Sequence, residues 1–287
     1  MRFYPVKQRI ERILTDLGLY APFKSSPIYE AYIRIIRPEI VRERALEIDF
    51  YRSLLRSFGD RAVVFDVGAN VGDKAEVFRR TACCVVCCEP DASGARFLRQ
   101  RFARDPKVTV LESAVSETEG TLTFLRFEGR SALNTVNAKW AELLCDQDHP
   151  RFERAQKPPQ SVAVTSVTLD GLIARYGVPS YVKIDVEGHE NVVLRGLTRK
   201  VPLLSFEVNL PEFREEALDC IACLEAIHPA ARFNYTVGTR ATHFGGNWIS
   251  ATEIAQWLRT TRATSFDVFV DNRFVEEMVQ PIAALAS

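Results

Sequence analysis

The sequence predicts an α/β protein in which a largely parallel sheet follows a helical N-terminal segment. From Arg61 onward, short apolar runs alternate with stretches whose apolar residues recur at helical spacing, which is the order of a sheet covered by helices. The first run, residues 62–67, leads through Gly68 and Gly72 into a helical pattern. A buried strand, a glycine turn and a helix start in this order bring backbone N–H groups close to a ligand. The turn therefore marks the expected binding site.

Composition argues against several classes of partner. Among 287 residues, Lys plus Arg and Asp plus Glu both number 37, so the net charge gives no reason to expect nucleic acid or an anionic membrane. No stretch approaches the ~20 apolar residues of a membrane span. The basic N-terminus also lacks the apolar run of a signal peptide. We therefore expect a cytoplasmic protein without a membrane span, and the sequence leaves its oligomeric state open.

The first 60 residues differ from the rest because they contain no nucleotide-binding motif. Apolar residues follow helical spacing in three stretches, 6–17, 28–36 and 40–58. Pro38 is expected to break this pattern. We predict an N-terminal helical cap at 1–60 on one domain at 61–287. A cap that covers the substrate and a segment that only braces the domain both fit the pattern.

Four of the seven cysteines lie in the run 83–88, whose spacing contains C-x-x-C. Zinc and redox sites use this spacing, but no second cysteine or histidine pair stands at zinc spacing in the chain. An odd number of cysteines also argues against a disulfide framework. We predict that these cysteines are small core residues of a central strand and hold no metal.

The glycine turn indicates which nucleotide binds. The dinucleotide fingerprint G-x-G-x-x-G would need glycines at two positions where the chain has Asn70 and Asp73, so a nicotinamide dehydrogenase is disfavoured. Asp66 instead places a carboxylate at the strand end, which suits a ligand that has an ammonium group there and no phosphate. S-adenosylmethionine (SAM) is the common ligand of this kind, and we predict it as the cofactor.

Later strand ends supply groups for the rest of the cofactor. The second strand, 84–88, ends at Glu89. A carboxylate at this point of a doubly wound sheet reaches the ribose hydroxyls, and we expect Glu89 to face solvent when the site is empty. The third strand, 108–112, ends at Ser113 and Ala114, a position that commonly flanks an adenine ring.

A second polar cluster follows the strand at 181–184. Asp185, Glu187 and His189 crowd its carboxyl end, which the switch-point rule places beside the ligand crevice of the first strand. His189, with a reference pKa of ~6.5, is the expected base for an acceptor hydroxyl, and Asp185 or Glu187 would orient it. The same three residues could instead bind a divalent metal. We favour the base, because residues at i, i+2 and i+4 across a turn need not converge.

The remaining chain completes the sheet. Further strands are expected at 162–167, 202–208, 232–237 and 266–270, and helices at 211–230 and 251–260. Glu207 lies near the carboxyl end of the strand at 202–208, and Asn209 follows that strand. Residues 140–159 are polar and contain prolines, so we expect a mobile excursion over the site.

Five short motifs in this order resemble the FkbM-type SAM-dependent methyltransferases. They occupy 65–72, 89–91, 114–116, 167–170 and 183–190, so the resemblance runs from about Val63 to Asn209. It implies a Rossmann-like, seven-stranded methyltransferase sheet whose last strand is antiparallel. It also implies an O-methyltransferase that acts on hydroxyls of sugars, glycans, polyketides or other natural products.

The resemblance assigns individual residues to the cofactor. Asp66, Gly68 and Gly72 would line the methionine part of SAM, Glu89 its ribose, and Ser113 and Ala114 its adenine, with Asn70 and Asp185 also in contact with the cofactor. The loop at 129–133 is similar to a Ser-Ser-Leu segment of the family, in which Ala132 replaces the second serine.

The acceptor is expected to be a small molecule or a glycan, bound by Ser131, Glu207 and Asn209. Residues 1–60 and 140–160 fall outside the family pattern and are the expected determinants of acceptor choice. Two alternatives remain, a methyltransferase for a lipid or another small metabolite, and a catalytically silent SAM-binding protein.

Overall fold

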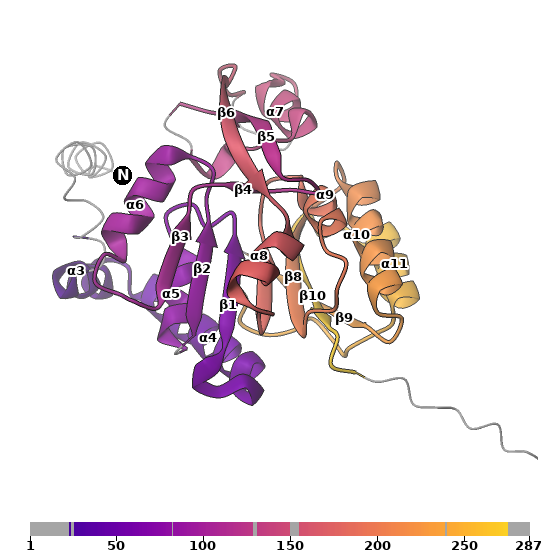
Figure 1. Cartoon of the computed structure of the whole chain (residues 1–287), viewed down its shortest axis with the longest axis horizontal. Helices are drawn as coiled ribbons and strands as arrows, with labels where there is room; N and C mark the ends of the chain where they lie inside the picture. The colour runs from indigo at the N-terminus through magenta and orange to yellow at the C-terminus, as the bar shows by residue number, and fades with distance from the viewer. Residues whose placement is uncertain are drawn as a thin grey trace, which may run out of the picture.

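The computed structural model describes residue 23 and residues 26–81, 83–128, 131–149, 155–238 and 240–274. The helix predicted at 6–17 lies outside these ranges. Figure 1 shows a central sheet with helices on both faces and a smaller sheet beyond one end of it. This arrangement is the α/β architecture that the alternating sequence pattern predicts.

The central sheet has seven strands in the order β3-β2-β1-β7-β8-β10-β9. Their bounds are β1 (Val63–Val67), β2 (Cys84–Cys88), β3 (Val108–Leu111), β7 (Tyr181–Ile184), β8 (Leu203–Asn209), β9 (Arg232–Val237) and β10 (Ser265–Asp271). β10 runs antiparallel to β8 and β9, and the other neighbours pair in parallel. The predicted seven-stranded sheet with an antiparallel last strand is confirmed. The chain reverses its direction across the sheet between β1 and β7, so their carboxyl ends form the switch point.

Helices cover both faces of this sheet. The first face carries α8 (Leu169–Tyr176), α9 (Glu190–Arg195), α10 (Arg214–Ile227) and α11 (Ala251–Thr260), and the second carries α5 (Asp73–Arg80) and α6 (Ala92–Arg101). Successive residues of β1 alternate between the two cores, with Phe65 in the first and Val64 in the second. A strand that is buried on both faces consists almost entirely of apolar residues. This is why residues 62–67 could be predicted as a buried strand from the sequence.

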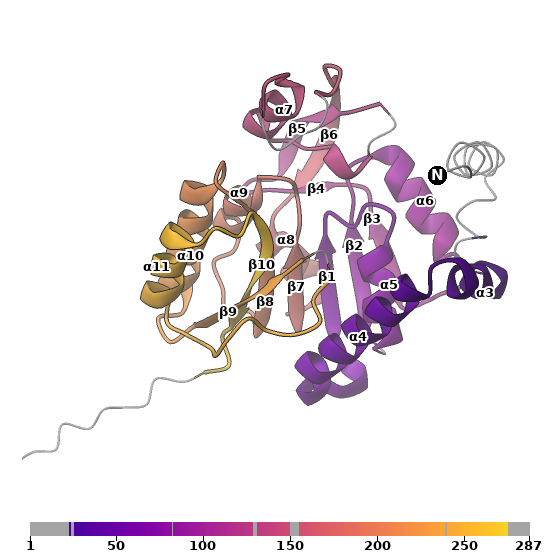
Figure 2. The same ribbon diagram turned by 180° about the vertical axis from the view of Figure 1, so that it is seen from behind.

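The N-terminal helices join the second layer. α3 (Pro27–Ile36) and α4 (Pro38–Leu55) are followed by the 3-10 helix η1 (Arg56–Arg61). Pro38 opens α4, because a proline in the first turn lacks only an N–H that has no helical partner. Tyr51 of α4 is fully buried against Phe78 and Tyr181, with ring centroids 4.9 and 5.7 Å away. Figure 2 shows α4 and α5 in front of the sheet, on the face turned away from the viewer in Figure 1. Buried residues of α4 therefore form part of the core of the main domain.

A second, three-stranded sheet is inserted between β3 and β7. Its order is β4-β6-β5, with β4 (Ala114–Val115), β5 (Gly120–Arg126) and β6 (Gln160–Val167), and the same excursion contains η2 (Ser131–Leu133) and α7 (Ala138–Cys145). Part of the segment predicted as a polar excursion is therefore helical. Trp140 and Leu144 of α7 are buried, and the Trp140 ring meets that of Phe213 at 5.7 Å. Figures 1 and 2 place this insertion beyond the carboxyl ends of β1, β2 and β3.

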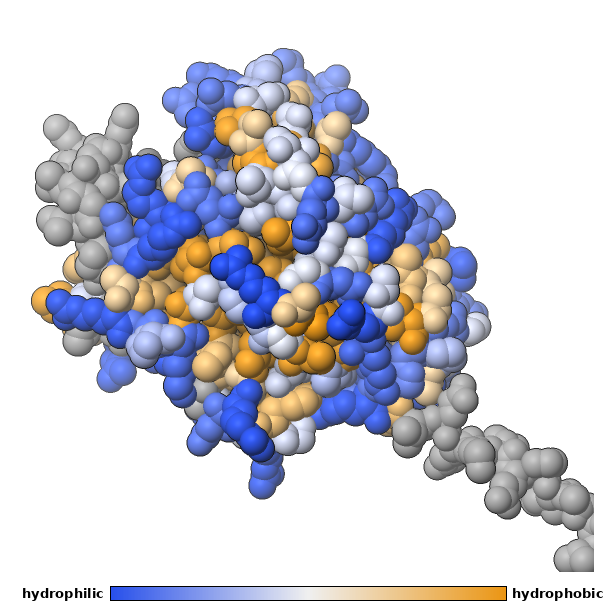
Figure 3. Space-filling model, viewed as in Figure 1, coloured by the Kyte–Doolittle hydropathy of each residue, from blue (hydrophilic) through white to orange (hydrophobic). Residues whose placement is uncertain are grey.

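The cysteine run lies in and next to β2. Cys83, Cys87 and Cys88 are buried, Cys84 is half-buried, and none of the four is in a disulfide. Their predicted place in the core is confirmed. On the face drawn in Figure 3, hydrophilic residues cover most of the periphery and apolar residues gather toward the middle. Within the described ranges, no helix has both the length and the apolar character needed to cross a membrane.

The glycine turn brings β1 close to the end of β7. Gly68 has φ +83°, and a Cβ there would lie 1.8 Å from the carbonyl oxygen of Asp185. The backbone N–H of Asp185 in turn donates to the carbonyl of Val67 at 3.0 Å. Only glycine fits this conformation and this separation without displacing one of the two strands.

Gly68→Ala is expected to lower the free energy of unfolding by ~2 kcal/mol or more, because the added methyl group meets backbone and not a flexible side chain. Gly246→Ala is the matched control, since a Cβ there meets nothing within 4 Å. The control should cost less than about 0.5 kcal/mol. Urea unfolding of both variants measures the difference, and equal stabilities would show that β1 and β7 do not constrain each other at this point.

Candidate active site

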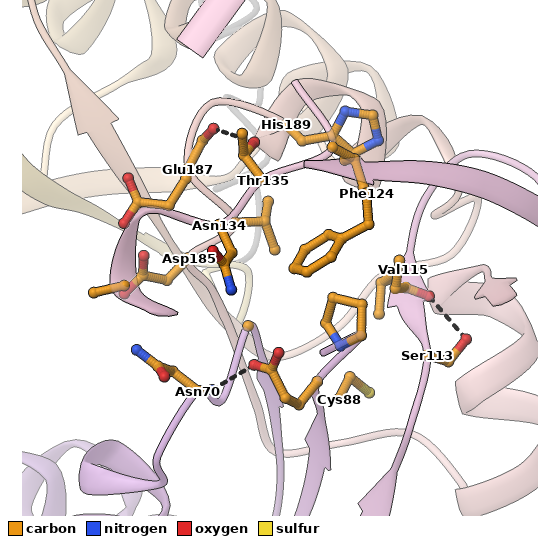
Figure 4. A pocket seen from close by; sticks show the side chains of 17 residues that line it. Asn70, Cys88, Ser113, Val115, Phe124, Asn134, Thr135, Asp185, Glu187 and His189 are labelled. Carbon is orange, nitrogen blue, oxygen red and sulfur yellow. Dashed lines mark hydrogen bonds between the residues drawn. The ribbon is translucent and has the colours of Figure 1, made fainter. Parts of the chain in front are cut away.

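A pocket opens at the switch point, between the carboxyl ends of four strands and the inserted sheet (Figure 4). The predicted site residues that line it are Gly68, Asn70, Glu89, Ser113, Ala114, Asp185, Glu187 and His189. They come from the ends of β1, β2, β3 and β7, which the sequence had placed at one crevice. In the described part of the chain, the lining begins at Gly68, and neither α3 nor α4 contributes to it.

Two residues predicted to line the methionine part of SAM do not line this pocket. Asp66 is 1% exposed, and the alternation of β1 turns it toward the layer of α4 and α5. Burial raises its pKa to about 6, although the Lys183 ammonium opposes the shift. Gly72 packs on α6, because a Cβ there would lie 2.6 Å from the side chain of Leu98. Neither residue lines this pocket, and their assignment to the methionine part of SAM stays a prediction.

The structure describes the side chains of two of the three residues predicted to bind the acceptor. Glu207 and Asn209 do not line the pocket, and the Asn209 amide donates to a Glu207 carboxyl oxygen at 3.0 Å. The side chain of Ser131 lies outside the part of the chain that the structure describes. Its neighbour Ala132, where the family segment has a serine, does line the pocket.

Glu89 is buried and does not face solvent, which corrects the sequence-based expectation. It is 7% exposed, and its two oxygens accept the backbone N–H groups of Asn70 at 2.7 Å and Asp91 at 2.9 Å. Burial raises the pKa of Glu89 to about 7, and the two backbone hydrogen bonds only partly offset that effect. The carboxyl group is thus fixed at the floor of the pocket by the glycine turn and by its own strand end.

Apolar side chains form the wall beside Ser113. Cys88, Pro90, Val115 and Phe124 line this part of the pocket, and Figure 4 shows Phe124 facing into it from β5. Sequence reasoning did not assign Phe124 to the site. The alternation of apolar residues in β5 was a usable signal, but it did not reveal that this sheet folds back over the crevice.

An acidic cluster occupies the opposite side. Carboxylate oxygens of Asp185, Glu187 and Glu207 lie within 4.8 Å of one another, and they form the group that could hold a metal ion in the described part of the chain. The sequence had proposed His189 as the third member, where the structure has Glu207. Lys183, 2% exposed, donates to Asp185 Oδ2 at 2.6 Å.

Charges in this cluster are partly neutralised. Burial tends to raise the pKa of Asp185, but the adjacent Lys183 ammonium and the hydrogen bond with Glu207 hold it below its usual range. Burial, followed by the charges of Asp185 and Glu187, holds the pKa of Glu207 well above its usual range. The Asp185 carboxylate is therefore stabilised in its charged form, and the Glu207 carboxyl holds its proton more tightly than an exposed glutamate does.

His189 lies on the other side of the pocket, near Phe124 in Figure 4. Its Nε2 atom is 3.2 Å from the hydroxyl oxygen of Ser116, which follows β4. Burial, and to a lesser degree the Arg195 charge, lowers the pKa of His189 to about 4. The imidazole is consequently neutral at physiological pH, and its hydrogen bond directs it toward the adenine end of the predicted site.

The turn that follows Asp185 is held by several side chains. The Thr135 hydroxyl donates to the carbonyl of Glu187 at 2.9 Å, and the Asn137 amide donates to the carbonyl of Gly188. From the other side, Glu190 Oε1 accepts the N–H groups of Val186 and Gly188 at 3.0 and 3.3 Å. Sequence reasoning missed Thr135 and Asn137, although Asn and Thr in a loop are residues that hydrogen-bond to backbone.

The sheet order, with a pocket at its switch point, is that of a Rossmann-like fold. The family model described as a methyltransferase FkbM domain matches residues 66–260. The chain therefore belongs to the FkbM methyltransferase family, as the five motifs predicted.

The chain is similar to the hexuronic acid methyltransferase AglP of Haloferax volcanii, with 24% identity over 168 residues. The match covers 58% of this chain and 63% of that protein. Among solved structures, cofactor-bound Rv0187 from MTB has a TM-score of 0.40 and 13% identity, over 87% of this chain and 98% of that one. The plantazolicin methyltransferase BpumL in complex with SAH has a TM-score of 0.39 and 8% identity, over 93% and 99%.

Glu89 gives a prediction for the pH dependence of stability. Its pKa rises from an ordinary 4.5 to about 7 on folding, so the folded state binds this proton more tightly than the unfolded chain. This proton therefore adds to the free energy of unfolding, and the full contribution is present below about pH 4.5. The contribution is lost as the pH rises to about 7, and it amounts to roughly 3 kcal/mol at most. Glu89→Gln, which is uncharged at every pH, should remove this part of the decline.

Urea unfolding at pH 5 and pH 8 provides the measurement. Glu112→Gln is the control, because Glu112 is an exposed acid after β3. In this control, the free energy of unfolding should change between pH 5 and pH 8 as it does in the parent. The same change in Glu89→Gln as in the parent would mean that Glu89 is ionised in the folded protein.

Proposed function

We propose that this protein transfers a methyl group from SAM to a hydroxyl of a sugar, glycan or other natural product. The observation that carries the proposal is one continuous pocket with a buried carboxyl group after β2 and an acidic turn after β7. The first suits the ribose of a nucleoside, and the second suits a polar acceptor. The FkbM family assignment supports methyl transfer as the reaction.

The residues present fit SAM. Each Glu89 oxygen accepts one backbone N–H and keeps a lone pair for a ribose hydroxyl. The apolar wall of Pro90, Val115 and Phe124 matches the faces of an adenine ring. The methionine part would then lie over the turn at Gly68 and Asn70, next to the end of β7. In this order the cofactor follows the strands β3, β2 and β1 across the sheet.

SAM, when bound, supplies a methyl group on a sulfonium leaving group, so alignment of the acceptor oxygen with that carbon contributes much of the rate. The chain contributes the alignment. Glu89 and the glycine turn would hold the cofactor, and Ala132, Asn134 and Thr135 of the inserted loop line the space left for the acceptor. A side chain of the pocket must also accept the hydroxyl proton as the new bond forms.

A sugar hydroxyl is the acceptor that the relative suggests, since that protein is named as a hexuronic acid methyltransferase. Transfer of tritium from methyl-labelled SAM into a panel of monosaccharides, oligosaccharides and lipid extracts tests this directly. Label in saccharides supports the proposal. Label only in lipid would contradict the sugar assignment, and SAM binding without transfer to any fraction would indicate a silent binding protein.

At pH 8, where the Glu89 carboxyl is mostly ionised, Glu89→Ala should weaken SAM binding by roughly 1.5–3 kcal/mol, since hydrogen bonds to a charged group are lost. Isothermal titration would then show a dissociation constant about 10–100 times higher. Glu112→Ala, which removes an acid from the end of β3 outside this pocket, is the control and should bind SAM as the parent does. Circular dichroism of both variants checks that the fold is retained. Unchanged affinity in a folded Glu89→Ala variant would place the ribose elsewhere.

A further inference from the structure

We propose that Glu187 is the base that takes the proton of the acceptor hydroxyl, and that Thr135 and Asn137 are positioning residues that hold its turn. This inference rests on the proposed methyl transfer and names the proton acceptor within the same site. It gives Glu187 the role for which the sequence suggested His189.

The backbone of Glu187 is the first observation. Its φ is +55°, in the left-handed region, where a residue with a side chain is strained and glycine is not. The next residue, Gly188, also has a positive φ of +90°. A turn built for stability alone would be expected to have glycine at both positions. A glutamate at the first indicates that the side chain is kept there for a purpose that outweighs the strain.

The second observation is the number of groups that hold this conformation. Thr135 and Asn137 bond to the carbonyls of Glu187 and Gly188 from the inserted loop. Glu190 bonds to two N–H groups of the same turn from the start of α9. Two elements that are distant in sequence thus fix the turn from both sides. Such fixation is what a base needs, because proton transfer depends on a donor–acceptor separation near hydrogen-bond length.

The third observation is the position of Glu187 in the pocket. Strand order places the cofactor over β3, β2 and β1, so the acceptor must approach from the next strand, β7. Glu187 lines the pocket beyond that strand, on the side of Asp185 (Figure 4). His189 lies across the pocket, against Ser116 and near the wall assigned to adenine. Of these two groups, Glu187 is therefore the one on the acceptor side.

The proton balance is simple. The acceptor hydroxyl loses its proton to a Glu187 carboxylate oxygen while the hydroxyl oxygen forms a bond to the methyl carbon. The carbon–sulfur bond breaks, and sulfur keeps its electron pair. The products are a methyl ether, S-adenosylhomocysteine and a protonated Glu187, which returns its proton to solvent when the pocket opens.

A pair of variants separates a functional role from a structural one. Glu187→Gly removes the carboxylate and also relieves the left-handed backbone, whereas Glu187→Ala removes the carboxylate and keeps the strain. We expect the glycine variant to melt at or above the temperature of the parent, and above the alanine variant. Both should lose turnover by about 10²–10⁴-fold, the usual contribution of a positioned base. A glycine variant that melts several degrees below the parent would show that the side chain serves the fold.

Activity measurements complete the test, with an acceptor found by tritium transfer. Glu187→Gln should lose kcat by about 10²-fold or more while its SAM affinity changes little, and His189→Asn should lose far less. Thr135→Val should lower kcat with little change in the KM for SAM, and Thr135→Ser, which keeps the hydroxyl, should recover most of the loss. Thr260→Val is the control, because the Thr260 hydroxyl makes a similar bond to the carbonyl of Gln256 in α11, outside the pocket.

Three outcomes would overturn the inference. A Glu187→Gln variant with full turnover would do so, and so would a larger loss in His189→Asn than in Glu187→Gln. Loss of turnover in EDTA, restored by Mg²⁺, would mean that the carboxylates of Asp185, Glu187 and Glu207 serve a cation. Failure of the proposed function looks different, since the parent protein itself would then transfer no label to any acceptor.

Discussion

The close approach of Gly68 to the carbonyl of Asp185 is the constraint on which the rest of the structure depends. Around it, the N–H groups of Gly68 and Ala69 both donate to the carbonyl of Cys88 at 3.0 Å, so backbone hydrogen bonds connect the ends of β1 and β2. The N–H of Asp185 connects β7 to β1 in the same way. Three strand ends therefore meet without intervening side chains. That leaves room above them for a ligand, and it sets Glu89 and Asp185 on two sides of one crevice.

The inserted sheet supplies what the central sheet lacks. Its loop and strands return to the switch point at three places, where Ser116 meets His189, Thr135 meets Glu187 and Asn137 meets Gly188. The central sheet alone would present its strand ends to solvent. With the insertion in place, the acidic turn is fixed and the apolar wall around Phe124 is complete. The insertion therefore contributes to both sides of the pocket, the acidic turn and the apolar wall.

The sequence predicted the sheet better than it predicted the direction of individual side chains. Buried apolar runs between glycine turns and helical patterns gave the positions of the seven strands, and the polar residues at the strand ends gave about half of the lining of the pocket. The burial of Asp66 was not foreseen, because the motif gives its position in the strand but not the face to which the alternation of β1 turns it. Glu207 joined the acidic cluster through pairing of β8 with β7, which is a long-range contact. Thr135 and Phe124 were missed because nothing local shows that an inserted sheet folds back over a crevice.

The central claim is that the pocket at the switch point is where SAM or its product binds. Hydrogen–deuterium exchange with and without S-adenosylhomocysteine tests it most directly, because bound ligand slows the exchange of the amides that it covers or orders. We expect protection over residues 66–73, 89–91, 113–116 and 185–189. We expect no change in a separate groove between α4 and the segment 242–248, which is lined by Phe50, Leu54 and Phe244. Protection confined to that groove, with unchanged exchange at the glycine turn, would contradict the account.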